Sequence, residues 1–273
     1  MKIYKSLLII ITGFFLIACE DVVEADLDTA EPRLVIDASI NWIKNTPGNE
    51  QKIRLSTTTA YYSNEFPAVS GADITIKNSA NTIFNFVENP GTGEYICTYF
   101  EPVIGETYTL TIYLNGETYT ATETLMGVPH IENTIDQNNT GGISGDETEI
   151  IYYYQDNAAQ ENYYLNSVKN PHIAFPEYRA EDDQNNQGNL VPIFYSNKNL
   201  KPGDTVHIQL FGISKRYFDY FRKLLSASGN NNTPFPTTPT SIRGNIINQT
   251  HSENFAYGYF RLSEADQKNY VIQ

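Results

Sequence analysis

Hydrophobic and polar residues alternate with a period of two along much of the chain after residue 33. Within residues 34–42, one side of an extended segment would carry an apolar row: Leu34, Ile36, Ala38, Ile40 and Trp42. The residues between them are mostly polar. Because successive side chains of a strand point to opposite faces of its sheet, this alternation predicts a half-buried strand.

Shorter segments of the same kind follow, and clusters of turn-forming residues such as Thr46-Pro47-Gly48-Asn49 separate them. The pattern predicts strands over four further ranges: 53–55, 72–76, 84–86 and 95–100. Tyrosine, phenylalanine, threonine and isoleucine are abundant in these ranges, which agrees with their preference for strands.

The clearest pair of predicted strands covers residues 107–114 and 117–122, on either side of Asn115-Gly116. Asn-Gly between two alternating segments is the strongest short signal for a hairpin, because both turn residues must accept positive φ. A two-residue turn would place Leu110 opposite Ala121 and Ile112 opposite Tyr119.

Residues 33–126 would therefore hold about seven short strands, which predicts an antiparallel β-sandwich. The order of the glycine-led strands resembles immunoglobulin-like or transthyretin-like modules. Gly127-Val128-Pro129 marks the predicted end of this domain.

A second β-rich domain is predicted over residues 127–273. Its expected strands cover residues 150–155, 162–169, 191–196, 205–213, 241–247, 256–262 and 270–272. Residues 138–145 are polar and glycine-rich, and residues 181–189 are rich in acids and amides, so both ranges are expected to be loops.

One amphipathic helix is predicted near residues 214–227. Its aromatic and leucine side chains recur at helical spacing: Tyr217, Tyr220, Phe221, Leu224 and Leu225. Ser214 is the expected N-cap, and Gly229 is the expected stop. The basic residues lie mostly off the apolar face, and packing against the domain's own sheet is favoured over contact with a membrane.

The first residues have the pattern of a secretory leader. Lys2 and Lys5 precede an apolar run from Leu7 to Ile17, which is too short to span a bilayer comfortably. Leu16-Ile17-Ala18-Cys19 resembles the bacterial lipobox, which implies a signal peptide over residues 1–18 and a lipidated Cys19. Residues 19–32 would then be an acidic tether, and the alternative is an ordinary cleaved signal.

The composition describes a folded, acidic chain. Of 273 residues, 40% are hydrophobic and 18% are charged, and the formal net charge is −14. Such a charge repels the phosphates of nucleic acids, so nucleic-acid binding is excluded. The 20 tyrosines and 14 phenylalanines fit strands, and exposed aromatic rings that bind sugars are the alternative.

No catalytic or metal-binding motif stands out. The four histidines His130, His172, His207 and His251 are far apart in the sequence, and no nucleophile elbow or phosphate-binding glycine loop is present. Glu181-Asp182-Asp183 offers oxygen ligands for calcium, but it lacks the spacing of an EF-hand loop. With Cys19 lipidated, Cys97 has no disulfide partner and is expected to be a buried apolar residue.

Several segments together resemble a known family over nearly the whole mature length. They are Thr29 to Ile36, Asn64 to Ala72, Ile213 to Tyr220, Pro234-Phe235, Arg243 to Ile246 and Gly258 to Phe260. The family consists of Bacteroidota outer-membrane lipoproteins and is labelled domain of unknown function 4249. The resemblance implies a role beside TonB-dependent transporters, near which such proteins are often encoded, and it supplies no catalytic residues.

Two short signals in the tether resemble those of exported Bacteroidota proteins. The acids at positions 20, 21 and 24 resemble a signal for export to the cell surface, although a solvated linker has the same composition. Asp28-Thr29-Ala30 resembles an O-glycosylation signal, with Thr29 as the acceptor, and Asp204-Thr205-Val206 is a second match at a less accessible place.

We therefore expect a non-enzymatic, lipid-anchored outer-membrane protein without a cofactor, on the cell surface or on the periplasmic face. Its expected partners are a TonB-dependent transporter and a glycan or peptide ligand. The alternatives are a surface adhesin or structural module, and an enzyme acting on glycans. The last would need two carboxylates at a defined separation, and no motif places such a pair.

Overall fold

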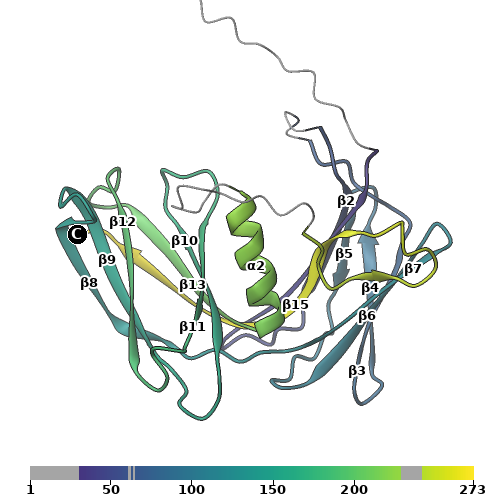
Figure 1. Cartoon of the computed structure of the whole chain (residues 1–273), viewed down its shortest axis with the longest axis horizontal. Coiled ribbons are helices and arrows are strands. Elements are labelled where there is room, and N and C mark those ends of the chain that lie inside the picture. Colours follow the sequence, from purple (N-terminus) through teal and green to yellow (C-terminus); the bar gives the residue numbers. More distant parts are fainter. Residues whose placement is uncertain (1–30, 61–62, 64, 229–241) are drawn as a thin grey trace, which may run out of the picture. The chain divides into compact units, whose positions relative to one another are not determined.

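The computed structural model of the protein describes residues 31–60, 63, 65–228 and 242–273. Residues Pro32–Gln273 form one compact unit (Figure 1). Strands dominate this unit, which confirms the expected mainly-β fold, and α2 (Lys215–Ala227) is the helix among the described residues. None of the helical segments in this described part has the length and apolarity that a membrane span requires.

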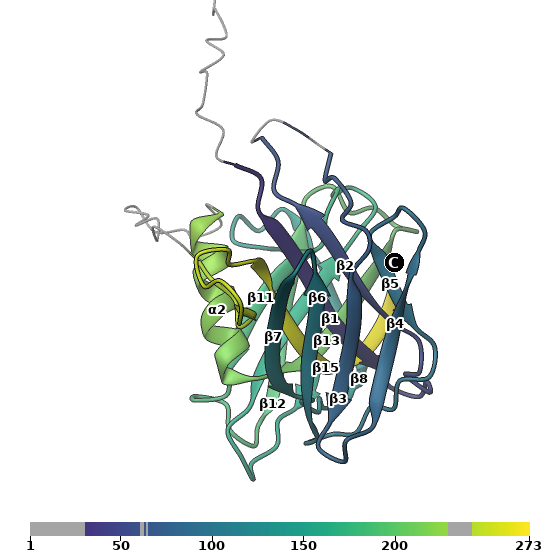
Figure 2. The same ribbon diagram turned by 90° about the vertical axis from the view of Figure 1, so that its right-hand side faces the viewer.

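The N-terminal half contains the expected antiparallel β-sandwich. Its strands are β1 (Leu34–Ile43), β2 (Gln51–Thr57), β3 (Asp73–Asn78), β4 (Ile83–Asn89), β5 (Glu94–Cys97), β6 (Thr107–Leu114) and β7 (Glu117–Thr124). Figure 2 shows β3, β6 and β7 as a layer in front of β1. The alternating apolar side chains fill the core between the two layers, where Ile36, Ile40, Ile53, Tyr95 and Tyr108 are fully buried.

The predicted hairpin between β6 and β7 is confirmed residue by residue. Leu110 pairs with Ala121, and Ile112 pairs with Tyr119. The turn residues Asn115 and Gly116 have φ values of 51° and 82°. Both values lie in the left-handed region, as the tight turn requires.

The C-terminal half supplies the other strands. They are β8 (Ile131–Gly141), β9 (Glu147–Gln155), β10 (Tyr163–Lys169), β11 (Glu177–Asp182), β12 (Leu190–Asn197), β13 (Thr205–Ile213), β14 (Ile247–Asn248) and β15 (Tyr257–Val271). A three-stranded sheet, in the order β12-β9-β8, packs against β10 and β13 around a second core that includes Tyr152, Tyr164, Ile193 and Ile208.

Strand β15 joins the two halves. Its residues Tyr257–Ala265 pair in parallel with β1, and its residues Ala265–Val271 pair antiparallel with β13. A continuous sheet results, in the order β11-β10-β13-β15-β1-β2-β5-β4-β3-β6-β7-β14. β15 contributes to the hydrophobic cores of both halves. The predicted division into separate domains at residues 33–126 and 127–273 stays a prediction.

Expectations for five ranges of the C-terminal half are corrected. The predicted loop at 138–145 begins inside β8, and the predicted loop at 181–189 begins inside β11. Both strands are polar, so the apolar alternation that reveals buried strands is missing. The strand expected at 241–247 is reduced to β14, and the strands expected at 256–262 and 270–272 are parts of β15.

Physical reasons account for the differences at β14 and β15. Near β14, the side chain of Asn245 replaces a backbone partner: its Nδ2 donates to the carbonyl of Phe260 (2.8 Å), and its Oδ1 accepts from the Phe260 N–H (2.9 Å). Within β15, charged residues at 261, 264 and 266 interrupt the apolar pattern, yet all three side chains are buried.

The predicted helix is confirmed, with Ser214 as its N-cap. The Ser214 Oγ accepts from the Tyr217 N–H at 3.2 Å, as an N-cap side chain does. The buried face is shifted from the expected one, because Tyr217 and Phe218 are buried whereas Leu224 is 39% exposed. The expected stop Gly229 lies outside the described residues.

Candidate functional site

The two residues with predicted modifications, Cys19 and Thr29, lie outside the described residues, so both assignments stay predictions. Cys97 is described and is a free, buried thiol on β5, as expected. Burial raises the pKa of the Cys97 thiol, which keeps it in the unreactive protonated form.

The acidic side chains at residues 181–183 make contacts within the fold. Burial raises the pKa of Glu181, and Asp183 accepts a hydrogen bond from the Asn162 N–H at 2.8 Å. Within the described residues, no three metal-ligating side chains come together at these or other positions.

The four histidines do not form a common site. Each ring has its own partner: His130 lies 3.5 Å from Asp266, His172 lies 2.6 Å from Asp204, His207 lies 2.6 Å from Asn269, and His251 lies 2.9 Å from Glu117. The hydrogen bond from His172 lowers the pKa of the Asp204 carboxyl.

An unusual combination of side chains lies beneath helix α2. A cavity of about 410 Å³ opens there between the helix and the sheet strands β1, β15, β13, β10 and β11. We call it the α2 groove. Its lining residues are Asp37, Ser39, Asn41, Ile43, Leu165, Tyr178, Gln209, Phe211, Tyr217, Phe221 and Arg261. A volume in this range suits a small ligand.

Strand register explains why polar groups gather in the groove. Ser39 of β1 pairs with Arg261 of β15, and Asn41 pairs with Ser263, so their side chains share one face of the sheet. The apolar residues between them, such as Ile40 and Leu262, point to the opposite face and into the N-terminal core.

Arg261 is the most unusual residue of the groove, because it is only 5% exposed and yet has no acidic partner among the described residues. Its Nη1 donates to Ser263 Oγ (2.7 Å), and its Nη2 donates to Asn41 Oδ1 (2.8 Å). Its buried Nε has no hydrogen-bond partner in the described structure. A guanidinium has five N–H donors, so Arg261 retains donors for a further acceptor.

Two aromatic rings hold the guanidinium in place. Its central carbon lies 4.9 Å from the centre of the Phe211 ring and 5.2 Å from that of Tyr217. Such cation–π contacts stabilise a positive charge, but they leave the N–H donors at the edge of the guanidinium free for hydrogen bonds.

Helix α2 is fixed over the groove by a carboxylate from the N-terminal sandwich. Glu123 of β7 accepts hydrogen bonds from the N-cap Ser214 (3.1 Å) and from the Tyr259 hydroxyl (3.2 Å). Burial raises the pKa of Tyr217, and it raises that of Tyr220 to about 12. Of these two tyrosines, Tyr217 lines the groove, and its ring is therefore neutral at neutral pH.

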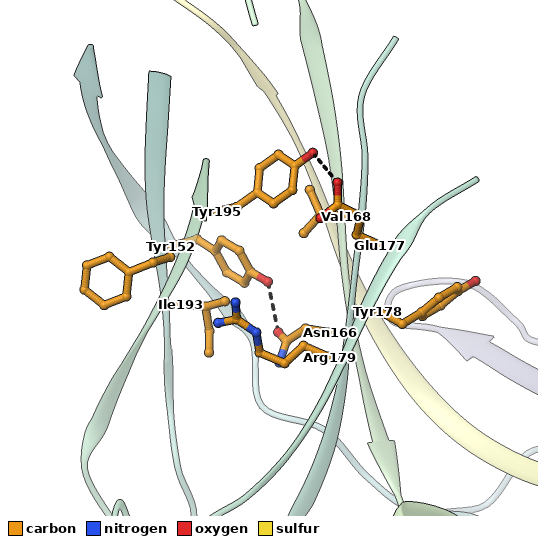
Figure 3. Close-up of a pocket in the computed structure, with 9 residues that line it drawn as sticks. Tyr152, Asn166, Val168, Glu177, Tyr178, Arg179, Ile193 and Tyr195 are labelled. Atoms are coloured by element: carbon orange, nitrogen blue, oxygen red, sulfur yellow. Dashed lines mark hydrogen bonds between the residues drawn. The ribbon is translucent and has the colours of Figure 1, made fainter. Parts of the chain in front are cut away.

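A second, smaller cavity of about 100 Å³ lies between β10–β11 and the three-stranded sheet (Figure 3). Tyr152 donates to Asn166 Oδ1 at 3.0 Å, and Tyr195 donates to Glu177 at 3.4 Å. The buried Nδ2 of Asn166 has no partner within the described residues. The cavity is small, and its polar groups mostly satisfy one another, so we take the α2 groove as the main candidate site.

Sequence reasoning missed the α2 groove. Its residues come from six elements, and the hydrogen bond between Asn41 and Arg261 joins positions 220 residues apart. One signal was available: Arg261 is a charged residue between Phe260 and Leu262 in a predicted strand. A charge at such a place needs a partner or a function.

Comparisons with known proteins give a family and distant structural likenesses. A family model described as Domain of unknown function (DUF4249) matches residues 20–269. No curated protein matches the chain. A two-domain fibronectin type-III segment of chicken tenascin is 12% identical, with 66% of this chain and 90% of that chain covered and a TM-score of 0.22. A DUF4785 family protein from Legionella pneumophila is 10% identical, with 66% and 52% covered and a TM-score of 0.26.

Proposed function

The chain belongs to the DUF4249 family of domains of unknown function, and we propose that it is a lipid-anchored, non-enzymatic ligand-binding protein of the outer membrane. In this proposal, Cys19 carries the lipid, and the folded unit assists a TonB-dependent nutrient transporter. The resemblance described from the sequence supports the transporter, and the predicted signal peptide that ends just before Cys19 supports the anchor.

The observation that carries the ligand-binding role is the α2 groove. Burying a guanidinium without an anion costs several kcal/mol, because the charge loses its hydration. A protein retains such a group when the charge serves a purpose, and a cavity beside the charge gives that purpose room. The described groove contains hydrogen-bonding groups and aromatic rings, which suit reversible binding of a polar ligand.

The anchor is tested by comparing the chain's two cysteines. The Cys19→Ser variant is expected to lose incorporation of a labelled fatty acid and to leave the membrane fraction. The matched Cys97→Ser variant keeps its lipid, because Cys97 is buried in the N-terminal core. Equal labelling of the wild type and Cys19→Ser would contradict the anchor.

The transporter association is tested by isolating the native protein from its membrane in a mild detergent. A TonB-dependent transporter is expected in the purified complex, and deletion of the gene for this chain is expected to reduce uptake of the transporter's nutrient. Recovery of the protein alone, together with unchanged uptake, would refute the accessory role and would favour an adhesin or structural module.

A further inference from the structure

The α2 groove identifies the chemistry of its ligand. We propose that the groove binds a small ligand through a carboxylate group, which the ligand places against Arg261. This inference rests on the proposed ligand-binding function and adds the class of ligand.

The first reason is charge. Arg261 is the cation that lines the groove, and the described ion pairs leave it without a carboxylate. Asp37 lines the same groove, but it is exposed and accepts the Ser39 hydroxyl at 2.8 Å. An anionic group on a ligand would supply the counter-charge that the protein does not provide.

The second reason is geometry. The planar guanidinium offers parallel N–H donors that match the two oxygens of a carboxylate. Ser263 and Asn41 occupy one donor on each terminal nitrogen, while Nε remains unpartnered. Because Phe211 and Tyr217 lie within cation–π distance of the guanidinium, its plane is held in a fixed orientation for an incoming acceptor.

The third reason concerns the rest of the ligand. Ser39, Asn41 and Gln209 offer neutral donors and acceptors, and Tyr178 and Phe221 offer ring faces. These groups fit a polar body that carries hydroxyls or amides. Two sources of the carboxylate have such a body, a sugar acid and the C-terminus of a short peptide, and the experiment separates them.

The experiment follows the Arg261 Nε–H signal of the folded, unlipidated protein by NMR, with the signal assigned by its loss in Arg261→Lys. The probes are D-galacturonate with its neutral methyl ester, and N-acetyldiglycine with its neutral amide. We expect at least one acid to shift the signal saturably and to bind at least about tenfold more tightly than its neutral partner. The acid that does so identifies the source.

A second variant keeps the test decisive if substitution of Arg261 unfolds the protein. Asn41→Asp is nearly isosteric, gives up the 3.3 Å hydrogen bond from Asn41 Nδ2 to the Ser39 carbonyl, and places a carboxylate at the 2.8 Å position where Arg261 already donates. The variant is expected to remain folded and to lose the binding of the acid by about tenfold or more, because the cation is then neutralised internally. Asn199→Asp adds the same charge at an exposed turn and is expected to bind as the wild type does.

The proposal is overturned if neither acid shifts the Arg261 signal at millimolar concentration, if the neutral partners bind equally well, or if Asn41→Asp binds the acid as the wild type does. These results would leave the lipid anchor and the transporter complex unaffected, since those are measured by fatty-acid labelling and by co-purification. A failed co-purification, conversely, says nothing against a carboxylate site.

Discussion

The contact between Gly258 and Ile36 determines whether β15 can lie beside β1. Gly258 has a φ of +103°, and a Cβ added to it would lie 1.9 Å from the Ile36 carbonyl oxygen. Gly258 pairs with Ile36 in the parallel register, next to the Tyr259 and Arg261 side chains on the groove face. We predict that Gly258→Ala separates the two strands and disrupts the α2 groove.

The magnitude has two parts. A side chain in the left-handed region costs about 1–2 kcal/mol. Relieving a 1.9 Å contact with the backbone requires a shift of β1 or β15. Overpacking of this kind costs about 1–3 kcal/mol. Each buried backbone group that loses its hydrogen-bond partner costs about 1–3 kcal/mol more. With one such backbone group, the sum is about 3–8 kcal/mol, a large fraction of the 5–15 kcal/mol by which a typical domain is stable.

Gly203 provides the matched control, because it has a φ of +93° and no atom within 4 Å of an added Cβ. Gly203→Ala should lower the free energy of unfolding only by the cost of the backbone conformation, about 1–2 kcal/mol. Urea unfolding followed by circular dichroism measures both variants, provided that the slope of each transition stays unchanged. If Gly258→Ala lies within about 0.5 kcal/mol of Gly203→Ala, the close approach does not constrain the fold, and the reasoning is refuted.

Three further predictions concern buried or partly buried groups. Asn245→Ala should destabilise the fold by about 2–4 kcal/mol in urea unfolding, because both backbone groups of Phe260 lose their partner, and a loss below about 1 kcal/mol would contradict that role. Burial raises the folded-state pKa of Glu181 above its unfolded value, so Glu181 makes the fold less stable as pH rises and its carboxyl becomes charged. Glu181→Gln should therefore raise the melting temperature at pH 7 more than at pH 3. An equal rise in melting temperature at both pH values would refute burial of the charge as the cause. Cys97 should react with a thiol reagent only after unfolding, and rapid labelling of the native protein would show that the thiol is accessible.

The N-terminal sandwich could be predicted in detail because it follows local rules. One face of each strand is buried and the other is largely solvated, so the apolar period reports the strand directly. The Asn115-Gly116 turn also fixes the register of β6 and β7, because its length leaves one pairing that keeps both apolar faces inward.

The C-terminal strands could be predicted only in part, because burial there does not follow a simple alternation. In β15, eight consecutive residues from Tyr259 to Asp266 are buried, since the cores lie on one face of the strand and α2 lies on the other. Glu264 and Asp266 are satisfied by the backbone N–H groups of Val128 and Ile131. A local pattern cannot reveal partners that lie about 135 residues away.

The same long-range pairing explains why the candidate site could not be predicted from sequence. Asn41 and Arg261 meet only where β15 pairs with β1, so the groove depends on the pairing that joins the two halves of the compact unit. Without that pairing, this edge of β1 would be unpaired, and the guanidinium of Arg261 would be hydrated. Seating β15 removes the exposed edge but buries the cation, so the fold gains a strand pairing at the cost of an unbalanced charge. A ligand carboxylate would restore that balance, and its binding would therefore stabilise the junction that forms the site.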